Sequence, residues 1–403
     1  MRKLDSKAAQ ARDKKAAIGT DIDIDAYSKQ APRHETIEDL ETLSDAEKNQ
    51  LLRAGVDSTE NGKSGTYIQK DASAIYSFSH EDGLEIYPIR EALESLEWVK
   101  EYYGTLVPVD LDKYTARAHA DLQDGYVIRA LPGSKITFPV QTCLYLHQEG
   151  STQNVHNIVI AEEGSEIHVI SGCVAANHVS SGLHIGISEF FVKKNAKLSF
   201  TMIHHWAEDM AVRPRSVTEV EEGGLFLSNY VSMKPIKSIQ MYPTTRLKGA
   251  GAVARFYSLL VGSPGSDLDI GGRVLLNAED TRAEIVSRAI TNGGNITARG
   301  DLVGEVPGVK GHLECHGLIL NGGSMHAIPE LKGMVDGVEM SHEAAVGKIA
   351  QEEILYLMSR GLTEEEATAT IVRGFLNIDI PGLPPKLKAE IDKAVEMSQH
   401  EVM

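Results

Sequence analysis

Three cysteines are the residues of this sequence with the clearest potential for chemistry. Cys315 lies in the segment GHLECHGLILNGGSMHAIPEL (311–331), between Glu314 and His316. A cysteine thiolate can ligate a metal or accept sulfur, and neighbouring imidazoles lower its pKa, although an adjacent carboxylate opposes that shift. The segment therefore leaves three alternatives open: a metal site, a catalytic thiol, or a buried cysteine with polar neighbours.

A second group of potential ligands follows in the segment SHEAAVGK (341–348), which contains His342 and Glu343. One sulfur, one imidazole nitrogen and one carboxylate oxygen form a plausible incomplete coordination sphere for iron. If the sequence repeats with a period of about 28, Glu343 follows Cys315 by one period. The spacing then predicts that Cys315, His342 and Glu343 lie close together.

Such a repeat is visible in the turn residues from about residue 105 onward, where short alternating apolar runs replace helical patterns. Two series of turns, half a period apart, each recur with a nearly constant interval of about 28, and only the first interval is clearly longer. The first series is Gly164, Asn195, Gly223, Gly251, Glu279 and Gly308, and the second is Gly265, Gly293 and Gly322. Two interleaved registers indicate a solenoid with two strands per coil, such as a parallel β-helix. An antiparallel sandwich is the alternative, but sandwiches rarely have so even a spacing.

The register also places the cysteines. Cys143, Cys173 and Cys315 lie about 10, 9 and 7 residues after turns of the first series, so we expect all three in the same strand layer. The separation of Cys173 and Cys315 is about five periods, which corresponds to roughly 24 Å along the stack. Spacing alone favours Cys143 and Cys173 as buried, inert cysteines. Of the adjacent His204 and His205, at most one can face inward, because successive strand residues point to opposite faces.

Helical patterns flank the repeats on both sides. The stretch TIEDLETLSDAEKNQLLRAGV (36–56) contains a capping box that begins at Ser44, and a second helical stretch ends at Gly104. Beyond about residue 330 we expect a helical hairpin, whose first helix ends at Gly361 and whose second begins at Thr363. The segment KLKAEIDKAVEMSQHEVM (386–403) can form a last amphipathic helix.

The second helix of the hairpin has an apolar stripe that includes Ile371, Val372, Phe375 and Leu376. Packing against the solenoid is the simpler interpretation of the stripe, and docking of a partner protein is the alternative. We therefore predict three parts: an N-terminal helical, partly flexible region (1–104), a β-helix core (105–330) and a C-terminal helical domain (331–403).

Composition and absent motifs exclude several functions. The chain has 403 residues and a formal charge of −17, which argues against non-specific binding to nucleic acid or to an anionic membrane. No apolar run reaches the roughly 18–20 residues that span a bilayer, and the N-terminus lacks the apolar core of a secretion signal. Three scattered cysteines indicate free thiols in a reducing cytoplasm. The motif G-x-x-x-x-G-K-[ST] does not occur, so we expect no nucleotide on this chain.

The block MSHEAAVGKIAQEEILYLMSRGLTEEEATATIVRGFL (340–376) resembles the C-terminal region of the SufB/SufD family of iron–sulfur cluster assembly proteins nearly throughout. The segment 311–331 resembles the stretch before it, and the resemblance extends over about residues 95–376. It implies a mainly β fold, a right-handed parallel β-helix flanked by N- and C-terminal helical regions. It also implies a scaffold rather than an enzyme, on which a nascent iron–sulfur cluster is assembled and then transferred to apo-proteins.

The resemblance implies roles for individual residues. Cys315 matches the cysteine considered to accept the nascent cluster, and Glu343 and His342 match its proposed partners. Cys173, in the triplet SGC, matches a cysteine thought to receive sulfur at the far end of a tunnel. The chain departs from the family pattern at Ser341, where an acidic residue is usual, and at His204, where a glutamine is usual. It thus combines SufB-like with SufD-like features, and the sulfur relay is less well supported than the cluster site.

The resemblance also implies partners. The C-terminal helices would dock a SufC-type ABC ATPase, through Ile371, Val372 and Phe375, and two copies of the chain would form a homodimer, or a SufB/SufD heterodimer with a relative. A sulfur donor and apo-protein acceptors complete the expected set. The alternative function is a SufD-like structural subunit without its own cluster. A third possibility is a β-helical carbohydrate-active enzyme, but this sequence lacks the paired inward carboxylates that such an enzyme needs.

Overall fold

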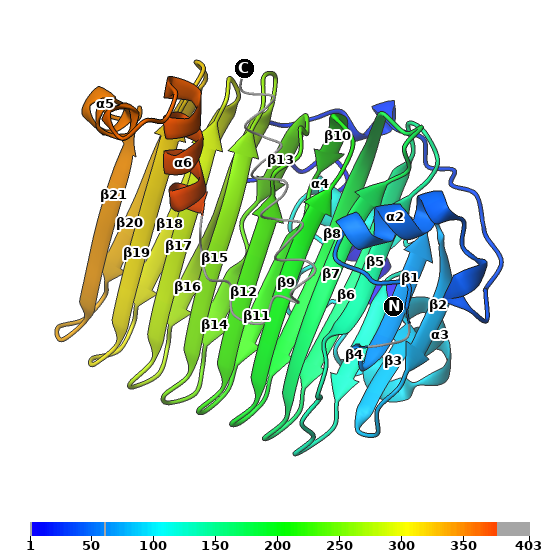
Figure 1. Cartoon of the computed structure of the whole chain (residues 1–403). Coiled ribbons are helices and arrows are strands. Elements are labelled where there is room, and N and C mark those ends of the chain that lie inside the picture. Colours follow the sequence, from blue (N-terminus) through cyan, green and yellow to red (C-terminus); the bar gives the residue numbers. More distant parts are fainter. Residues whose placement is uncertain (1, 60–61, 377–403) are drawn as a thin grey trace.

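The computed structural model describes residues 2–59 and 62–376, and its dominant feature is a stack of long strands in two facing sheets (Figure 1). Sheet 1 has the strand order β2-β1-β5-β7-β9-β12-β15-β17-β19-β21. Its strands are β1 (Gly65–Lys70), β2 (Ser73–Ser79), β5 (Val140–Leu146), β7 (Glu166–Ala175), β9 (Lys197–His205), β12 (Leu225–Ser232), β15 (Val253–Gly262), β17 (Arg282–Thr291), β19 (Lys310–Ile319) and β21 (Glu339–Gly347).

Sheet 2 contains the strands that alternate with those of sheet 1 along the chain. They are β3 (Leu84–Pro88), β4 (Tyr126–Ala130), β6 (Thr152–Ala161), β8 (Ser181–Val192), β10 (Asp209–Val212), β11 (Arg215–Val220), β13 (Ser238–Met241), β14 (Thr244–Leu247), β16 (Asp267–Leu276), β18 (Asn295–Gly304) and β20 (Ser324–Gly333). The single strand β8 pairs with both β10 and β11. Pro214 separates these two, because proline cannot donate a ladder hydrogen bond.

Parallel pairing between successive coils confirms the predicted solenoid. In sheet 1 each strand from β5 to β21 pairs in parallel with the strand one coil away. Among the named strands of the described residues, antiparallel pairing is confined to β1–β2 and β3–β4, at the first coil. The sandwich alternative is therefore wrong.

The predicted turn residues have the left-handed backbone that a tight turn requires, with one exception. Positive φ angles occur at Gly164, Asn195, Gly223, Gly251, Gly308, Gly265, Gly293 and Gly322. In the fifth turn of the first series the residue with positive φ is Asp280 (φ 58°), not the predicted Glu279. Aspartate tolerates this conformation better than glutamate, because its short side chain hydrogen-bonds locally.

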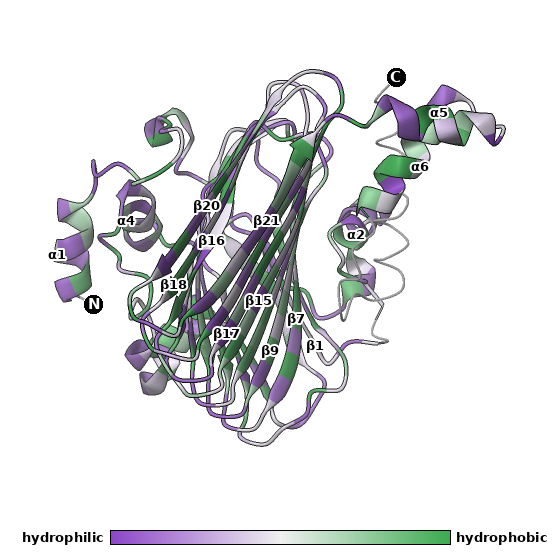
Figure 2. Cartoon of the chain, turned by 90° about the vertical axis from the view of Figure 1, so that its left-hand side faces the viewer, coloured by the Kyte–Doolittle hydropathy of each residue, from purple (hydrophilic) through white to green (hydrophobic). Residues whose placement is uncertain are grey.

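The helices lie on the outer faces of the two sheets, as the end-on view shows (Figure 2). On the sheet 1 side are α2 (Asp45–Arg53), α5 (Gln351–Ser359) and α6 (Glu364–Leu376), and on the sheet 2 side are α1 (Arg2–Gln10) and α4 (Lys113–Ala120). The remaining elements are α3 (Ile89–Ser95) and the 3₁₀ turns η1 (Ile24–Ala26), η2 (Leu40–Thr42) and η3 (Glu97–Glu101). No helix of the described segments is both long and apolar enough to cross a membrane.

Three predicted helix signals are confirmed, whereas the helical stretch predicted to end at Gly104 is formed by α3, which ends at Ser95, and by the 3₁₀ turn η3. Ser44 caps α2 in a capping box, the turn after α5 contains Gly361 with φ 99°, and Thr363 accepts a hydrogen bond from the backbone N–H of Glu366 at the start of α6. The last predicted helix (386–403) lies outside the described residues.

The solenoid extends further in both directions than the expected range 105–330. The strands β1, β2 and β3 lie within the region that we predicted to be helical, and β1 pairs with β5 of the next coil. At the other end β21 adds one more strand, up to Gly347. The first three strands are short and include the antiparallel pairs, so they do not share the turn spacing from which the repeat was recognised.

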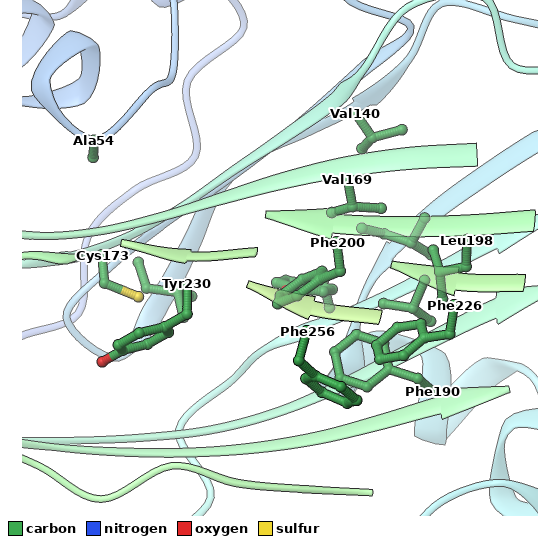
Figure 3. Close-up of a cluster of buried hydrophobic side chains, with 14 of the residues drawn as sticks. Ala54, Val140, Val169, Cys173, Phe190, Leu198, Phe200, Phe226, Tyr230 and Phe256 are labelled. Atoms are coloured by element: carbon green, nitrogen blue, oxygen red, sulfur yellow. The ribbon is translucent and has the colours of Figure 1, made fainter. Parts of the chain in front are cut away.

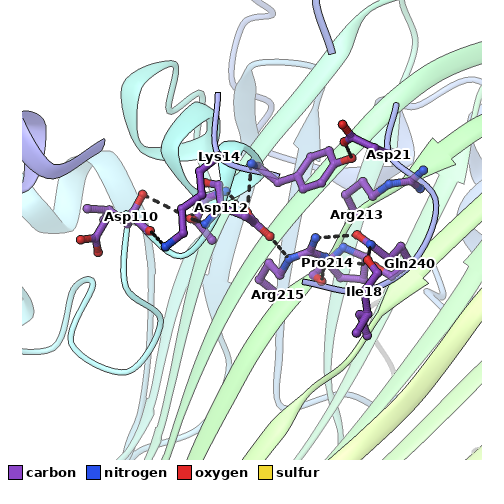
Figure 4. Close-up of polar contacts among 12 residues, drawn as sticks. Lys14, Ile18, Asp21, Asp110, Asp112, Arg213, Pro214, Arg215 and Gln240 are labelled. Atoms are coloured by element: carbon purple, nitrogen blue, oxygen red, sulfur yellow. Dashed lines mark hydrogen bonds and ion pairs between the residues drawn. The ribbon is translucent and has the colours of Figure 1, made fainter. Parts of the chain in front are cut away.

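An N-terminal arm (residues 11–30) runs along the outer face of sheet 2 and ties α1 to the middle coils (Figure 4). The Lys113 ammonium contacts the carboxylate of Asp21 at 2.6 Å. Further along, Gln240 donates to the carbonyl of Ile18, and Thr20 donates to Asp267 over 2.8 Å. Polar side chains therefore hold this arm together with Ile24, which is buried in an apolar cluster.

Candidate functional site

Cys315 faces the interior of the solenoid. Along β19, Leu313 and Cys315 are buried whereas Glu314 and His316 are half-exposed, which is the alternation of a strand with one face inward. Cys315 is the central inward residue, and its strand neighbour on β17 is Ser287. The crowded neighbours in the sequence, Glu314 and His316, thus point away from the thiol.

The thiol of Cys315 is held in its protonated form in this structure. Only 1% of its surface is exposed. Loss of hydration on burial, and secondarily the nearby charge of Glu314, raises its pKa to about 11. Because the thiolate is the form that ligates metal, Cys315 has to become more exposed, or receive a cation, before it can act as a ligand.

The strand register corrects the predicted grouping of Cys315, His342 and Glu343. Cys315 pairs with Ala344, whereas His342 pairs with Leu313 and Glu343 pairs with Glu314. His342 is therefore on the same face as Cys315, displaced by two residues on the next strand. Glu343 is on the opposite, outer face, so the structure brings Cys315 and His342 to one side and leaves Glu343 on the other.

These residues lie at the open end of the stack. β21 is the last strand of sheet 1, and His342, Glu343 and Ala344 are all exposed on it. Within residues 2–59 and 62–376, no group of three His, Cys, Asp or Glu side chains is arranged to hold a metal ion. The candidate cluster site is therefore an incomplete pair, Cys315 and His342, beside an uncovered strand.

Cys173 lies in a very different setting, on β7 within closed coils. It is completely buried, and its thiol lies 3.5 Å from the thioether sulfur of Met202. Burial, with a smaller effect of the charge of Cys143, raises the pKa of Cys173 well above the usual 9.0. All three cysteines are free and all belong to sheet 1, which confirms the predicted common strand layer.

A buried polar cluster surrounds Cys173, and sequence reasoning identified only part of it. His204 pairs with Cys173 on the neighbouring strand and is hydrogen-bonded to the Tyr230 hydroxyl at 2.8 Å. His184 of sheet 2 is hydrogen-bonded to Gln153 at 3.0 Å, and burial lowers its pKa to about 3. The face of β9 opposite to His204 carries His205, as expected for adjacent strand residues.

The interval between the first two predicted turns predicts that His204 lies beside Cys173 on the next strand. The step in sequence from Gly164 to Asn195 equals the step from Cys173 to His204. His184 and Gln153 belong to sheet 2, and no interval measured within sheet 1 could have placed them.

An internal cavity of about 80 Å³ lies between the two sheets in the coils that separate Cys173 from Cys315. Its lining includes Met202 and His204 from the strand next to Cys173, and Ser287, the strand neighbour of Cys315. The phenylalanines between them form a ladder of ring–ring contacts: Phe190, Phe200, Phe226 and Phe256 (Figure 3). From β7 to β19 the sheet order has five inter-strand steps, which is roughly 24 Å at about 4.8 Å per step.

The apolar stripe of α6 packs against sheet 1. Val372 and Leu376 are buried there, and Phe375 contacts the same cluster. That cluster includes Val231, Leu259 and Ile290 on the outer face of sheet 1. Of the residues predicted to bind a partner, Val372 and Phe375 are thus engaged within the chain, and Ile371 is half-exposed.

A different face of the hairpin remains uncovered in the described structure. On α5 the exposed apolar side chains are Leu355, Tyr356 and Met358. Tyr356 has 58% of its surface exposed. Large apolar side chains that cluster in the open are typical of protein interaction surfaces.

Comparisons with known proteins agree with this architecture. Residues 144–375 match the family model described as "SUF system FeS cluster assembly, SufBD core domain". The chain is 48% identical, over 97% of both chains, to an iron–sulfur cluster assembly SufBD family protein of Methanothermobacter thermautotrophicus (strain Winter). It is 49% identical to one from Archaeoglobus fulgidus, over 89% of this chain and 96% of the relative. A Pyrococcus horikoshii relative is 32% identical over 90% of this chain.

The fold and the match to the core-domain model therefore define an iron–sulfur cluster assembly protein built on a parallel β-solenoid. Within that class, this chain belongs to the SufBD family.

Proposed function

We propose that this chain is the scaffold subunit on which a nascent iron–sulfur cluster is assembled and from which it is transferred to apo-proteins. The observation that carries the proposal is the position of Cys315, an inward thiol one strand from an open solenoid end, whose strand neighbour Ser287 lines an internal cavity. A thiol at such a place can receive sulfur from inside and meet an acceptor outside. Family membership supports the same role.

Cys315 and His342 are the proposed cluster ligands on this chain. They share a face on adjacent strands, and a thiolate with an imidazole suits iron. Two ligands cannot complete a cluster, so the others come from a second copy, a small thiol or the acceptor. Glu343 joins them only after β21 changes its register by one residue, because a one-residue shift turns a side chain to the other face.

Anaerobic reconstitution with iron and sulfide tests the site. Wild type, Cys315→Ser, His342→Ala and Glu343→Ala are compared by absorption and Mössbauer spectroscopy. We expect Cys315→Ser to lose the cluster, His342→Ala to retain less than half of it, and Glu343→Ala to be affected least. Full cluster content in Cys315→Ser would show that the site is wrong.

The same experiment decides the alternative, a SufD-like structural subunit without its own cluster. This alternative is favoured by one observation: the described residues contain no preformed group of three metal ligands. A wild-type chain that binds no cluster under conditions in which a SufB relative does would support it.

Cys173 is the proposed entry point for sulfur. Its thiol would take a sulfur atom from the persulfide of a donor, which leaves as a thiol, and the cavity lined by Met202 and Ser287 would lead toward Cys315. We expect Cys173→Ser to reconstitute normally with free sulfide but to lose donor-dependent assembly. Equal losses in both assays would make Cys173 a structural residue.

The exposed face of α5 is the proposed docking surface for a SufC-type ATPase, in place of Val372 and Phe375. Leu355 and Tyr356 are open to a partner, whereas Val372 is packed on sheet 1. We expect Tyr356→Asp to abolish co-purification with such an ATPase while the chain stays folded. Gln351→Asp is the control, since it adds the same charge to an exposed position of α5 and removes no apolar side chain. Unchanged co-purification of Tyr356→Asp would exclude this face.

A second copy of the chain is the proposed partner at the open end. The exposed apolar residues there are Ile328, Leu331, Met334, Val335 and Val346, and an uncovered edge strand readily pairs with another chain. We expect the wild-type chain to be a dimer in light scattering and Leu331→Asp to be a monomer. A monomeric wild type would contradict the assignment.

A further inference from the structure

One arginine ties the last turn of α6 to the strand that carries Cys315. Arg288, on the outer face of β17, donates to the carboxylate of Glu314 at 3.0 Å and to the backbone carbonyl of Phe375 at 3.5 Å. Its guanidinium also lies 5.8 Å from the ring centre of Phe375. A cation near the carbonyl end of a helix is favourable, because the helix dipole is negative there. Arg288 thus contacts the hairpin and β19 at the same time.

The contact reaches β19 at the position of the thiol. Glu314 and His316 flank Cys315 on the outer face, and the His316 ring nitrogen Nδ1 lies 3.3 Å from Glu314. On the inner face, Ser287, next to Arg288 in the sequence, pairs with Cys315. The outer-face contacts of Arg288 therefore support the short stretch of backbone that keeps Cys315 turned inward.

Elsewhere the hairpin is seated loosely. A cavity of about 540 Å³ lies between the hairpin and sheet 1, lined by residues that include Val261, Ile290, Leu320, Ile354 and Val372. Side chains that border a cavity lose dispersion contacts on that side. Beyond this cavity, the last turn of α6 is held by Leu376, which is buried against sheet 1, and by the contacts of Phe375 with Arg288.

We propose that Arg288 and Glu314 are positioning residues that couple the seating of the C-terminal hairpin to the burial of Cys315. With the pair intact, α6 rests on sheet 1 and Cys315 stays buried. When α6 lifts, β19 loses its outer support next to the open strand β21, and Cys315 becomes accessible. The inference rests on the proposed function only because that function gives Cys315 its role. A partner that docks on α5 would lift the hairpin.

Alkylation of the three free cysteines tests this coupling in the full chain without iron or sulfide. Iodoacetamide labelling at pH 8 is followed by mass spectrometry of the peptides that contain Cys143, Cys173 and Cys315. We expect Arg288→Gln to raise the labelling rate of Cys315 about tenfold, because iodoacetamide reaches a thiol more readily when strand β19 exposes it. Cys143 and Cys173 should not change, since both are completely buried in coils that precede the hairpin's contact with β17 and β19.

Two further variants sharpen the result. Arg255→Gln is the matched control, because Arg255 forms its ion pair with Glu284 on the same outer face and not with α6. In this variant the labelling rate of Cys315 should equal that of wild type. Arg288→Lys keeps the positive charge but loses the two-pronged guanidinium group, so the labelling rate of Cys315 should be intermediate. The coupling is overturned if Arg288→Gln labels at the wild-type rate, or if all three cysteines accelerate equally. A chain that fails to bind a cluster can still pass this test, so the two proposals fail separately.

Discussion

The two candidate cysteines, Cys173 and Cys315, occupy opposite kinds of environment in the same solenoid. Cys173 lies in closed coils, beside a buried histidine–tyrosine pair and a ladder of phenylalanines. Cys315 lies one strand from an end whose last strand is exposed along most of its length. The same repeated unit thus places one thiol among closed coils and the other next to an exposed strand, depending on whether further coils follow. Position along the stack therefore sets how close each thiol lies to an exposed strand.

The largest expected contrast between the two regions is in stability. Phe226→Ala removes a buried ring from the middle of the ladder and should lower the free energy of unfolding by about 3–5 kcal/mol. Val346→Ala, at the exposed end, should cost less than about 1 kcal/mol. Urea denaturation of both variants at pH 7 measures the difference. Similar losses would mean that the end coil is as tightly packed as the centre.

Thiol reactivity should separate the two sites next. The pKa of Cys315 is raised to about 11, so its thiolate fraction increases tenfold per pH unit below that value. Between pH 7.5 and 9.5 the alkylation rate of Cys315 should therefore rise roughly hundredfold. Cys173, whose pKa is raised well beyond that of an ordinary thiol, should stay unlabelled in the same samples. Labelling of Cys173 before Cys315 would reverse the comparison.

The smallest expected effect concerns acid stability. Burial lowers the pKa of His204 well below 6.5, so below pH 6.5 the unfolded chain binds a proton that the folded chain does not. Stability then falls with decreasing pH by up to about 1.4 kcal/mol per unit. His204→Gln should make this fall less steep between pH 6 and 5, as measured by urea denaturation at each pH. His342→Gln, at the exposed end, is the control, and a wild-type slope in His204→Gln would contradict the argument.

The turn pattern was sufficient to predict the solenoid and its strand layers. The residues between two coils repeat at nearly even intervals, and eight of the nine predicted turn residues have the left-handed backbone. The interval was not sufficient for the site, because even the coils near Cys315 differ in length by one residue. The step from Val253 to its partner Arg282 is one residue longer than the step from Arg282 to its partner Lys310. Since side chains alternate along a strand, one residue decides whether Glu343 faces Cys315 or the opposite side.

The apolar stripe of α6 shows a second limit of sequence reasoning. Val372 and Phe375 look alike on a helical wheel whether they meet a sheet or another protein, because both surfaces are apolar. Only the tertiary structure shows that they contact sheet 1, and that Leu355 and Tyr356 are the ones left open. The sequence thus predicted an interaction-prone hairpin but not which of its faces is free.

The N-terminal arm has a consequence for the order in which the molecule is built. Ile18 and Thr20 contact Gln240 and Asp267, partners that lie 222 and 247 residues further along the chain. A solenoid can form coil by coil as the polypeptide leaves the ribosome, since each coil contacts mainly its neighbours. The arm cannot take its place until β13 and β16 have been synthesised. The arm is therefore synthesised before these strands but fixed after them, and its contacts then hold coils that are already complete.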